Sequence, residues 1–432
     1  MNYQESLDYL EGLNKFGCKL GLVRITRLLE LLDDPQHRYK TIHITGTNGK
    51  GSTSVMLAGI FTHSEIKTGL YISPHLVSYT ERMQIDGQPI SEADFADCID
   101  VVKTFVDQMI TEGEESPTQF EVLTAMAFFY FAIKHVEYAV IEVGLGGLLD
   151  STNVIVPEAS VVTNVTFEHA DRCGGTLEGI AHHKAGIIKE GVPVITAAQG
   201  SALMILQAAA HKKNADIFVA GEDFASSFIS FDGSMQYLEF TSEILGVAKQ
   251  EYALQMLGEH QIENSALAIM TAHVIHNMDA RITMESIAKG LELAVWPGRF
   301  EKINLDGQDI IIDGAHNPAG MKVLHRNLDI YFPARGRVIL LGILKDKDID
   351  AMLEELLRPN DTVVITVPQS DRASDPDVVA HKIKTQHIEV HKDPREALER
   401  SLELANKERI LCAAGSLYLI GALRQMVLSK KM

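Results

Sequence analysis

Short apolar runs rich in β-branched residues alternate with amphipathic stretches along most of this chain of 432 residues. Such alternation is typical of βαβ units, in which helices cover the faces of a parallel sheet, so the sequence predicts an α/β fold. In the first part of the chain, strands are expected at residues 41–44, 68–71, 138–143, 160–163 and 192–196, and helical periodicity is clearest after Gly49 and across 91–110, 120–134 and 177–188.

Two further patterns belong to this first part. From about residue 218 to residue 257 the hydrophobicity alternates with period 2 around a turn-forming run at 231–234, which predicts a small antiparallel insert. The residues before the first strand show helical patterning, with one apolar face made by Tyr3, Leu7 and Leu10 and another by Leu28, Leu29 and Leu32. We expect these N-terminal helices to pack on the first domain.

A turn-rich run, Trp-Pro-Gly-Arg at 296–299, ends the helical patterning of the first part. A second α/β series follows, with strands expected near residues 310–313, 338–344, 362–367, 388–391 and 409–413. The sequence therefore predicts a larger domain over residues 1–296 and a smaller, doubly wound domain over residues 297–432.

Composition excludes several classes of partner. With 58 acidic against 39 basic residues the formal net charge is -19, which repels the phosphate backbone of nucleic acid. The start of the chain lacks a basic and apolar leader, and the most apolar run, 123–133, is about half as long as a membrane span. Widely separated cysteines without a CxxC pair fit buried thiols in a reducing compartment: Cys18, Cys98, Cys173 and Cys412. We expect a cytoplasmic monomer without nucleic-acid or membrane partners.

The strongest local motif is TGTNGKGST at residues 45–53, which follows a short strand and opens a helix. Glycines let backbone amides approach phosphate oxygens, and the helix N-terminus adds positive potential. Lys50 would reach the terminal phosphates, and the hydroxyl of Ser52 or Thr53 is a ligand suited to Mg²⁺. A glycine between lysine and hydroxyl departs from the common order of such loops. The plain alternative is a glycine-rich turn with a surface lysine.

This loop resembles the ATP loop of the Mur ligase superfamily, and nearly the whole chain resembles its folylpolyglutamate synthase and dihydrofolate synthase branch. The supporting segments occur in the family's order: GLYISPHL (69–76), the Glu81-Arg82 pair, IEVGLGG (141–147), DSTN (150–153), HKAGIIK (183–189), GEHQIEN (258–264), PGRFE (297–301), DGAHNP (313–318), GILKDKD (342–348) and GSLY (415–418). The resemblance implies a P-loop-type mononucleotide-binding domain that carries the insert, followed by a Rossmann-like glutamate-ligase domain.

The reaction implied by the resemblance is ATP-dependent amide formation. A carboxylate of the acceptor attacks the γ-phosphate, and L-glutamate captures the acyl phosphate; the acceptor would be tetrahydrofolate or its polyglutamates, extended at the γ-carboxylate. Phosphoryl transfer depends on positioning and on neutralising phosphate charge, so the site needs lysine, arginine and Mg²⁺ rather than a covalent nucleophile. The catalytic candidates are Lys50, Lys184 and His316.

The resemblance also implies two Mg²⁺ ions, with ligands at Ser52, Ser73, Glu142, His169 and Lys184. Glu142 ends an apolar strand, where open parallel sheets place ligand residues. In the family the lysine of KAGI is carbamylated, which would give Lys184 a carboxylate-like group. A strand-end surface charge at Glu142, an ordinary histidine at His169 and an unmodified Lys184 remain the alternatives.

Nucleotide and substrate residues follow from the same resemblance. ATP would be held by Thr47, Asn48, Gly49, Lys50, Gly51, Ser52 and Thr53 of the loop together with Asn264, Arg299 and Asp313; Arg299 is suited to bridging phosphates bidentately. Folate and glutamate would contact Ser73, Pro74, His75, Arg82, His316 and Ser416. A proline turn at Ser73, and an ion pair or helix cap at Arg82, His316 and Ser416, are the alternatives.

Three positions depart from the family pattern. Leu148 stands where many relatives carry arginine, Glu168 replaces the usual aspartate before His169, and Asn164 occupies a position that is commonly small. These departures leave the ATP residues intact, so they bear on the acceptor rather than on the reaction class. Two alternatives to a folylpolyglutamate synthase therefore stay open: a bifunctional enzyme that also joins L-glutamate to dihydropteroate, and a weakened paralogue that binds ATP or folate without ligating.

Overall fold

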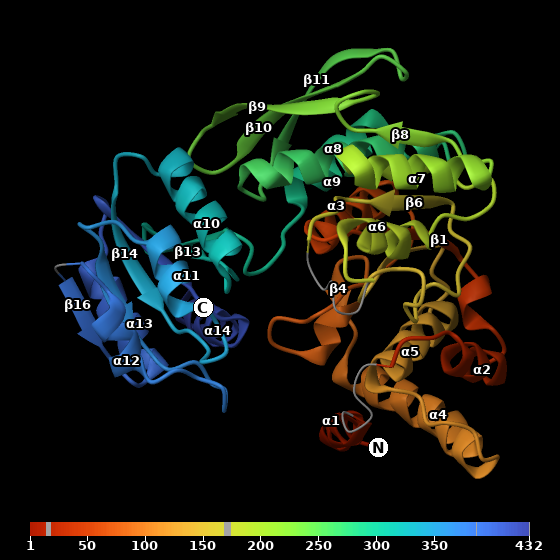
Figure 1. Ribbon diagram of the computed structural model, residues 1–432, viewed down its shortest axis with the longest axis horizontal. Helices are drawn as coiled ribbons and strands as arrows, with labels where there is room; N and C mark the ends of the chain where they lie inside the picture. Colours follow the sequence, from red (N-terminus) through yellow and green to blue (C-terminus); the bar gives the residue numbers. More distant parts are fainter. Residues whose placement is uncertain (14–18, 168–173, 386, 432) are drawn as a thin grey trace. The chain divides into compact units, whose positions relative to one another are not determined.

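The computed structural model describes residues 1–13, 19–167, 174–385 and 387–431, which form two compact units (Figure 1). Unit 1 comprises residues 1–230, 237–255 and 260–295, and unit 2 comprises residues 231–236, 256–259 and 296–432. Each unit has its own sheet and its own apolar core. The predicted two-domain α/β fold is confirmed.

Unit 1 is built on an eight-stranded sheet in the order β4-β3-β2-β5-β1-β6-β7-β8. Six of its strands are parallel, and the short β3 and β4 add an antiparallel edge. Strands β1 and β5 are buried almost throughout, as expected where helices cover both faces of a parallel sheet. The strands are β1 (Lys40–Thr45), β2 (Thr68–Tyr71), β3 (Met83–Ile85), β4 (Gln88–Pro89), β5 (Tyr138–Glu142), β6 (Ala159–Val162), β7 (Val194–Thr196) and β8 (Ile217–Val219).

The helices of unit 1 begin where the sequence supplies caps. Ser91 caps α4, and Thr118 forms a reciprocal capping box with Glu121 at the start of α5. Nearly every side of α5 is buried, so its apolar run is a core helix, and among the described residues no helix is long and apolar enough to cross a membrane. The helices are α1 (Tyr3–Gly12), α2 (Val23–Leu31), α3 (Lys50–His63), α4 (Glu92–Thr111), α5 (Gln119–Ile133), α6 (Leu177–Ala185), α7 (Gly200–Lys212), α8 (Glu259–His276) and α9 (Met284–Leu293), with 3-10 turns η2 (Pro35–His37) and η3 (Tyr79–Arg82).

The N-terminal helices pack as predicted. Leu10 of α1 and Leu28 and Leu29 of α2 are fully buried in one cluster with α4 and α5. Tyr3 of α1 packs edge-on against Phe95 of α4, with ring centroids 5.3 Å apart. The first two helices are therefore part of the core of unit 1.

The predicted antiparallel insert begins later than expected. A separate three-stranded sheet in the order β11-β10-β9 consists of β9 (Ala225–Phe231), β10 (Gln236–Ser242) and β11 (Val247–Leu254). Residues 217–219, placed in the insert by the sequence, instead form β8 parallel to β7 in the main sheet. The prediction was wrong there because this run is uniformly apolar and follows α7, which makes it the last strand of a βαβ unit.

Unit 2 contains a six-stranded sheet in the order β12-β13-β17-β14-β15-β16, parallel except for β12. The last strand lies between β13 and β14, so the carboxyl ends of β13 and β17 are neighbours. Its strands are β12 (Glu301–Leu305), β13 (Gln308–Ile312), β14 (Gly336–Leu341), β15 (Thr362–Ile365), β16 (His387–Val390) and β17 (Arg409–Ala414). Its helices are α10 (Pro318–Tyr331), α11 (Ile349–Leu356), α12 (Pro376–Lys382), α13 (Pro394–Leu404) and α14 (Leu417–Lys431).

Candidate active site

The carboxyl ends of four neighbouring strands carry most of the predicted site residues of unit 1. In the order β2-β5-β1-β6, Ser73 follows β2, Glu142 closes β5, the phosphate loop (residues 45–49) follows β1, and Asn164 follows β6. Open parallel sheets bind ligands at this edge, where successive loops form a crevice. The fold therefore brings Ser73, Glu142 and Lys50 to one edge of one sheet.

Glycines are required at two positions of the phosphate loop. Gly46 and Gly49 have φ angles of 153° and 84°. A Cβ atom on Gly46 would lie 1.7 Å from Thr163 Oγ1, and one on Gly49 would lie 2.1 Å from Asn264 Oδ1. Both backbone conformation and space exclude a side chain there.

Lys50 and the residues after it complete the loop. Lys50 Nζ donates to the carbonyl oxygens of Gly46 (3.0 Å) and Thr47 (3.1 Å), so the ammonium group lies over the loop it ends. Ser52 and Thr53 lie in the buried first turn of α3, and Thr53 Oγ1 is buried without a hydrogen-bond partner among the described residues. A buried unsatisfied hydroxyl is costly, which marks this turn as a place that a ligand would complete.

Glu142 is buried beside Ser73. The residue is 4 % exposed, and Glu142 Oε2 accepts a hydrogen bond from the Ser73 amide at 3.1 Å. Because the side chain is buried, the alternative of a solvated surface charge at Glu142 is wrong. The structure thus joins the loops that follow β2 and β5 through a carboxylate.

The loop after β5, residues 143–150, is shaped by Asp150. Its carboxylate accepts hydrogen bonds from Leu145 N (2.9 Å), Thr152 N (3.0 Å) and Thr152 Oγ1 (2.6 Å), and burial raises its pKa. The same loop contacts the phosphate loop, because Thr45 Oγ1 donates to Gly146 O at 2.6 Å. The DSTN segment therefore fixes the backbone next to Glu142.

Lys184 is buried in the last turn of α6, 5 % exposed. The loop after β5 packs on this turn: Leu148 N donates to His183 O at 2.7 Å, and a Cβ on Gly147 would lie 3.3 Å from Lys184 Cα. Leu148 itself is 45 % exposed. Leu148 therefore presents an apolar surface beside the Lys184 turn.

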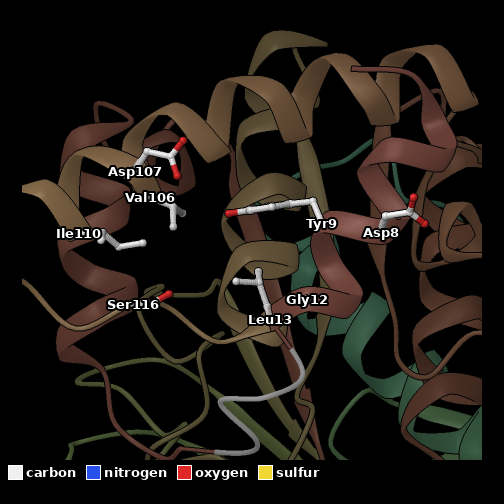
Figure 2. Close-up of a pocket in the computed structure, with 8 residues that line it drawn as sticks. All are labelled: Asp8, Tyr9, Gly12, Leu13, Val106, Asp107, Ile110 and Ser116. Atoms are coloured by element: carbon white, nitrogen blue, oxygen red, sulfur yellow. The ribbon is translucent and has the colours of Figure 1, made fainter.

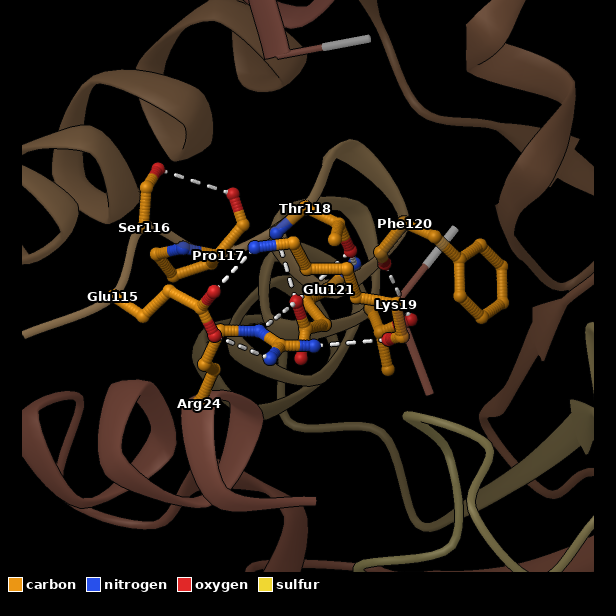
Figure 3. A network of polar contacts seen from close by, with 9 residues as sticks. Lys19, Arg24, Glu115, Ser116, Pro117, Thr118, Phe120 and Glu121 are labelled. Atoms are coloured by element: carbon orange, nitrogen blue, oxygen red, sulfur yellow. Dashed lines mark hydrogen bonds and ion pairs between the residues drawn. The ribbon is translucent and has the colours of Figure 1, made fainter. Parts of the chain in front are cut away.

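A polar network anchors the start of α5 (Figure 3). Arg24 Nε donates to the buried Glu121 carboxylate at 3.0 Å, and Arg24 also bonds Glu115 Oε2 and the Lys19 carbonyl. The adjacent Phe120 lies under Gly144, where a Cβ would come within 2.4 Å of the ring. The network therefore supports the backbone that follows Glu142.

Arg82, His75 and Tyr79 form a cluster after β2. Arg82 Nε donates to His75 Nδ1 at 2.9 Å, and the Arg82 guanidinium lies 5.1 Å from the Tyr79 ring centroid. Burial and then the Arg82 charge lower the pKa of His75 to about 4, so the imidazole is a neutral acceptor at pH 7. The neighbouring Pro74 is exposed, and its peptide bond with Ser73 is cis.

Asn264 lies against the phosphate loop together with Gln261, a residue that sequence reasoning missed. Asn264 Nδ2 donates to Gln261 Oε1 at 3.0 Å, and Gln261 Nε2 is buried without an acceptor among the described residues. The sequence signal that could have identified Gln261 was its spacing from Asn264, because residues three apart lie on one face of a helix.

In unit 2, the ends of β13 and β17 bring together Arg299, Asp313, His316 and Ser416. Asp313 accepts from Phe300 N (2.7 Å) and Ala315 N (2.8 Å), and desolvation raises its pKa against the opposing Arg299 charge. His316 Nδ1 donates to Gly314 O at 2.8 Å, and Gly415 N donates to Ala315 O at 2.9 Å.

Ser416 Oγ accepts the Tyr418 amide at 3.2 Å, which is the helix-capping bond that the sequence also allowed. Its contact with substrate stays a prediction.

The predicted metal ligand His169, with Glu168, lies outside the described residues. In the part of the chain that the structure describes, no group of three or more His, Cys, Asp or Glu side chains is placed to hold a metal ion. Glu142 is therefore the predicted carboxylate ligand that can be located, with hydroxyls at Ser52 and Ser73.

A separate hollow of about 290 Å³ lies beside α1 and α4 (Figure 2). It is lined by Asp8, Tyr9, Gly12, Leu13, Val106, Asp107, Ile110 and Ser116, none of which is a predicted site residue. The Tyr9 ring extends into it, with the hydroxyl directed towards the side of Val106 and Asp107 (Figure 2). The predicted chemistry is not located there.

Comparison with protein families and solved structures gives one consistent result. Residues 44–272 match the Mur ligase middle domain, and residues 298–417 match the Mur ligase glutamate ligase domain. The chain is 36 % identical over 436 residues to the folylpolyglutamate synthase of Lacticaseibacillus casei, with 100 % of both chains covered. It is 30 % identical over 426 residues to the dihydrofolate synthase/folylpolyglutamate synthase of Bacillus subtilis, with 98 % of each covered.

The crystal structure of folylpolyglutamate synthase from Thermotoga maritima superposes with a TM-score of 0.90 at 36 % identity, covering 99 % of this chain and 97 % of that one. Fold, motif order and sequence identity over the whole length thus agree. The chain belongs to the Mur ligase family, in its folylpolyglutamate synthase and dihydrofolate synthase branch.

Proposed function

We propose that this protein is an ATP-dependent ligase that adds L-glutamate to the γ-carboxylate of tetrahydrofolate and its polyglutamates. The observation that carries the proposal is the phosphate loop with Lys50, which follows β1 next to the end of β5 where Glu142 is buried, in a chain that matches folylpolyglutamate synthases from end to end. One similar solved structure is a folylpolyglutamate synthase complex with AMPPCP and folate, with a TM-score of 0.82 at 33 % identity, covering 99 % of this chain and 100 % of that one.

The chemistry assigned to unit 1 is activation of the acceptor carboxylate. A carboxylate oxygen attacks the γ-phosphorus of ATP, the bond to the bridging oxygen breaks, and ADP leaves with the electron pair. Amides of residues 47–53 hold the phosphates, and the Lys50 ammonium offsets the charge on the transferred phosphoryl group. The glutamate amine then attacks the acyl carbon, phosphate leaves, and the amine loses a proton.

The residues present fit Mg²⁺. Glu142, Ser52 and Ser73 offer hard oxygen donors, and the buried Thr53 hydroxyl has no hydrogen-bond partner among the described residues. This small number of protein donors is suited to Mg²⁺, because the ion keeps several water ligands and also binds the phosphates of the substrate. Bound there, Mg²⁺ would neutralise phosphate charge. His169 and Lys184 remain proposed ligands, the latter as a carbamate; intact-protein mass on gently handled material tests this, and a fully active enzyme with unmodified Lys184 would exclude it.

The remaining predicted residues complete the proposal. Residues 1–296 are proposed as the ATP-binding domain and 297–432 as the glutamate-ligase domain. Asn264, Arg299 and Asp313 would hold the nucleotide; His75 and Pro74 would contact folate; and glutamate would contact Arg82, His316 and Ser416. A cytoplasmic location and a monomeric state stay predictions.

The test is ADP release by the purified protein with Mg-ATP and L-glutamate, comparing tetrahydrofolate, dihydropteroate and no acceptor. We expect release with tetrahydrofolate and none from Lys50→Ala. Release with dihydropteroate as well would establish a bifunctional enzyme, an outcome favoured by the double name of the Bacillus subtilis relative. ATP binding without release in any arm would establish the weakened paralogue.

A further inference from the structure

The phosphate loop is held by a segment more than a hundred residues away in the sequence. The Asn164 carbonyl accepts Thr47 N at 3.0 Å, and the Asn164 carboxamide oxygen accepts Asn48 N at 2.9 Å. Thr163 Oγ1 donates to Asn48 O at 2.6 Å. Thr47 Oγ1 accepts a hydrogen bond from Thr166 N at 3.0 Å and donates one to Thr166 O at 3.3 Å.

These contacts restrain residues 47 and 48 of the loop, in addition to the bond from Lys50 Nζ to the Thr47 carbonyl. Gly46 and Gly49 allow the turn but do not enforce it, because glycine has the widest choice of backbone conformations. Residues 47 and 48 lie between them, and Asn48 is exposed. A loop without outside restraint would have to be ordered by the nucleotide, and that ordering would weaken binding.

Side chains bond both backbone polar groups of Asn48: Asn164 accepts from its amide, and Thr163 donates to its carbonyl. Thr47, in contrast, is held by backbone groups of residues 164 and 166, so a side-chain substitution at residue 164 or 166 does not remove these bonds. The two kinds of restraint can therefore be separated by mutation within one short segment.

We propose that Asn164 is a positioning residue for the nucleotide, whose carboxamide oxygen fixes the Asn48 amide so that the phosphate loop is preformed before ATP binds. Thr163 acts with it from the carbonyl side of Asn48. The proposal rests on the proposed function, because it takes the loop at residues 45–49 to be the ATP phosphate site.

The first test is nucleotide affinity. Asn164→Ala should raise the Kd for ADP, measured by calorimetry, and the KM for ATP by about fivefold to tenfold, as expected from one hydrogen bond. The kcat at saturating ATP and the KM for glutamate should stay within about twofold. Thr163→Val should act in the same direction, and Thr163→Ser, which restores the hydroxyl, should return the affinity towards that of the parent.

The matched control is Thr166→Ala, because the bonds of Thr166 to Thr47 run through its backbone. It should bind ADP as the parent does. Amide hydrogen exchange of the peptide over residues 46–50 gives a second measurement, and Asn164→Ala should speed that exchange in the nucleotide-free enzyme. If Asn164→Ala does not fold, Thr163→Val carries the same comparison.

Parent-like ADP affinity and parent-like exchange in both Asn164→Ala and Thr163→Val would overturn the proposal. An equal loss of affinity in Thr166→Ala would also overturn it, because the effect would then be a general loosening of the segment. Neither result touches the proposed function, which fails if the parent protein releases no ADP with Mg-ATP, L-glutamate and tetrahydrofolate.

Discussion

The two glycine-containing loops at the edge of the unit 1 sheet are held in different ways. The phosphate loop depends on residues 163–166, which follow a neighbouring strand. The loop after β5 carries its own clamp, because Asp150 bonds Leu145 and Thr152 within the same stretch of chain. The phosphate loop therefore depends on the register of two strands, whereas the loop after β5 has, besides its bonds to neighbouring segments, the Asp150 carboxylate as a restraint within its own stretch of chain.

The largest effect is expected where the neighbouring segment approaches most closely. Gly46→Ala should weaken ADP binding by about 100-fold or more, because its Cβ would overlap Thr163 Oγ1 at a backbone angle that disfavours alanine. Calorimetry with ADP measures this. The control is Gly87→Ala, which has a φ of 75° but nothing within 4 Å of its Cβ. An equal loss of ADP affinity in both variants would mean that contact with residues 163–166 is irrelevant.

A substitution in the clamp of the loop after β5 should lower the free energy of unfolding rather than the nucleotide affinity. Asp150→Ala removes the acceptor of three donors, two of them buried, and should lower the free energy of unfolding by about 3 kcal/mol. Asp232→Ala is the matched control, because Asp232 accepts the Ser234 and Met235 amides in an exposed turn. Urea unfolding of both variants measures the difference, and similar losses would show that burial of the clamp contributes nothing.

Another support of the loop after β5 comes from the α5 network (Figure 3). Arg24→Met should destabilise the protein by about 2 kcal/mol, because it leaves the buried Glu121 carboxylate without its guanidinium. Lys19→Met removes a cation from the same network, but the partner of Lys19 is the exposed Glu115, so the loss should stay below about 0.5 kcal/mol. Equal losses in thermal or urea unfolding would contradict this ranking.

The same contrast separates what the sequence could predict from what it could not. Strand β2 has the predicted bounds, and TGTNGKGST, Glu142 and the DSTN segment lie together because parallel strands end at one edge. The roles of Asn164 and Thr163 were not predictable, because their bonds to Asn48 span more than a hundred residues and depend on β1 and β6 being neighbours.

Two strands were also assigned wrongly or missed, because a short apolar run fits more than one kind of strand. Residues 217–219 looked like the start of the insert, and β12 was not predicted although Asp306-Gly307 supplies its hairpin turn to β13. The cluster of Arg299, Asp313 and His316 was expected from the resemblance. Its internal bonds, such as the Phe300 amide on Asp313, follow from the close approach of the chain before β12 to the end of β13.

The smallest expected effect concerns a side chain that links β1 to the Asp150 clamp. His43 lies fully buried in β1, and its Nε2 is 2.8 Å from Thr152 Oγ1. Because that hydroxyl donates to Asp150, His43 Nε2 carries the proton of the bond between the two side chains. Burial, and then the Lys189 charge, lower the pKa of His43 to about 3.

A native pKa below the unfolded value of 6.5 means that the unfolded chain takes up the proton first, so stability present above pH 6.5 is lost as the pH falls towards 3. Between pH 7 and pH 5.5 His43 should account for about 1 kcal/mol of lost stability. His43→Gln should remove that part of the stability loss, as measured by urea unfolding at the two pH values. If the variant loses as much stability as the parent over this interval, His43 takes up its proton in the native state, and the link between β1 and the clamp tolerates a charge.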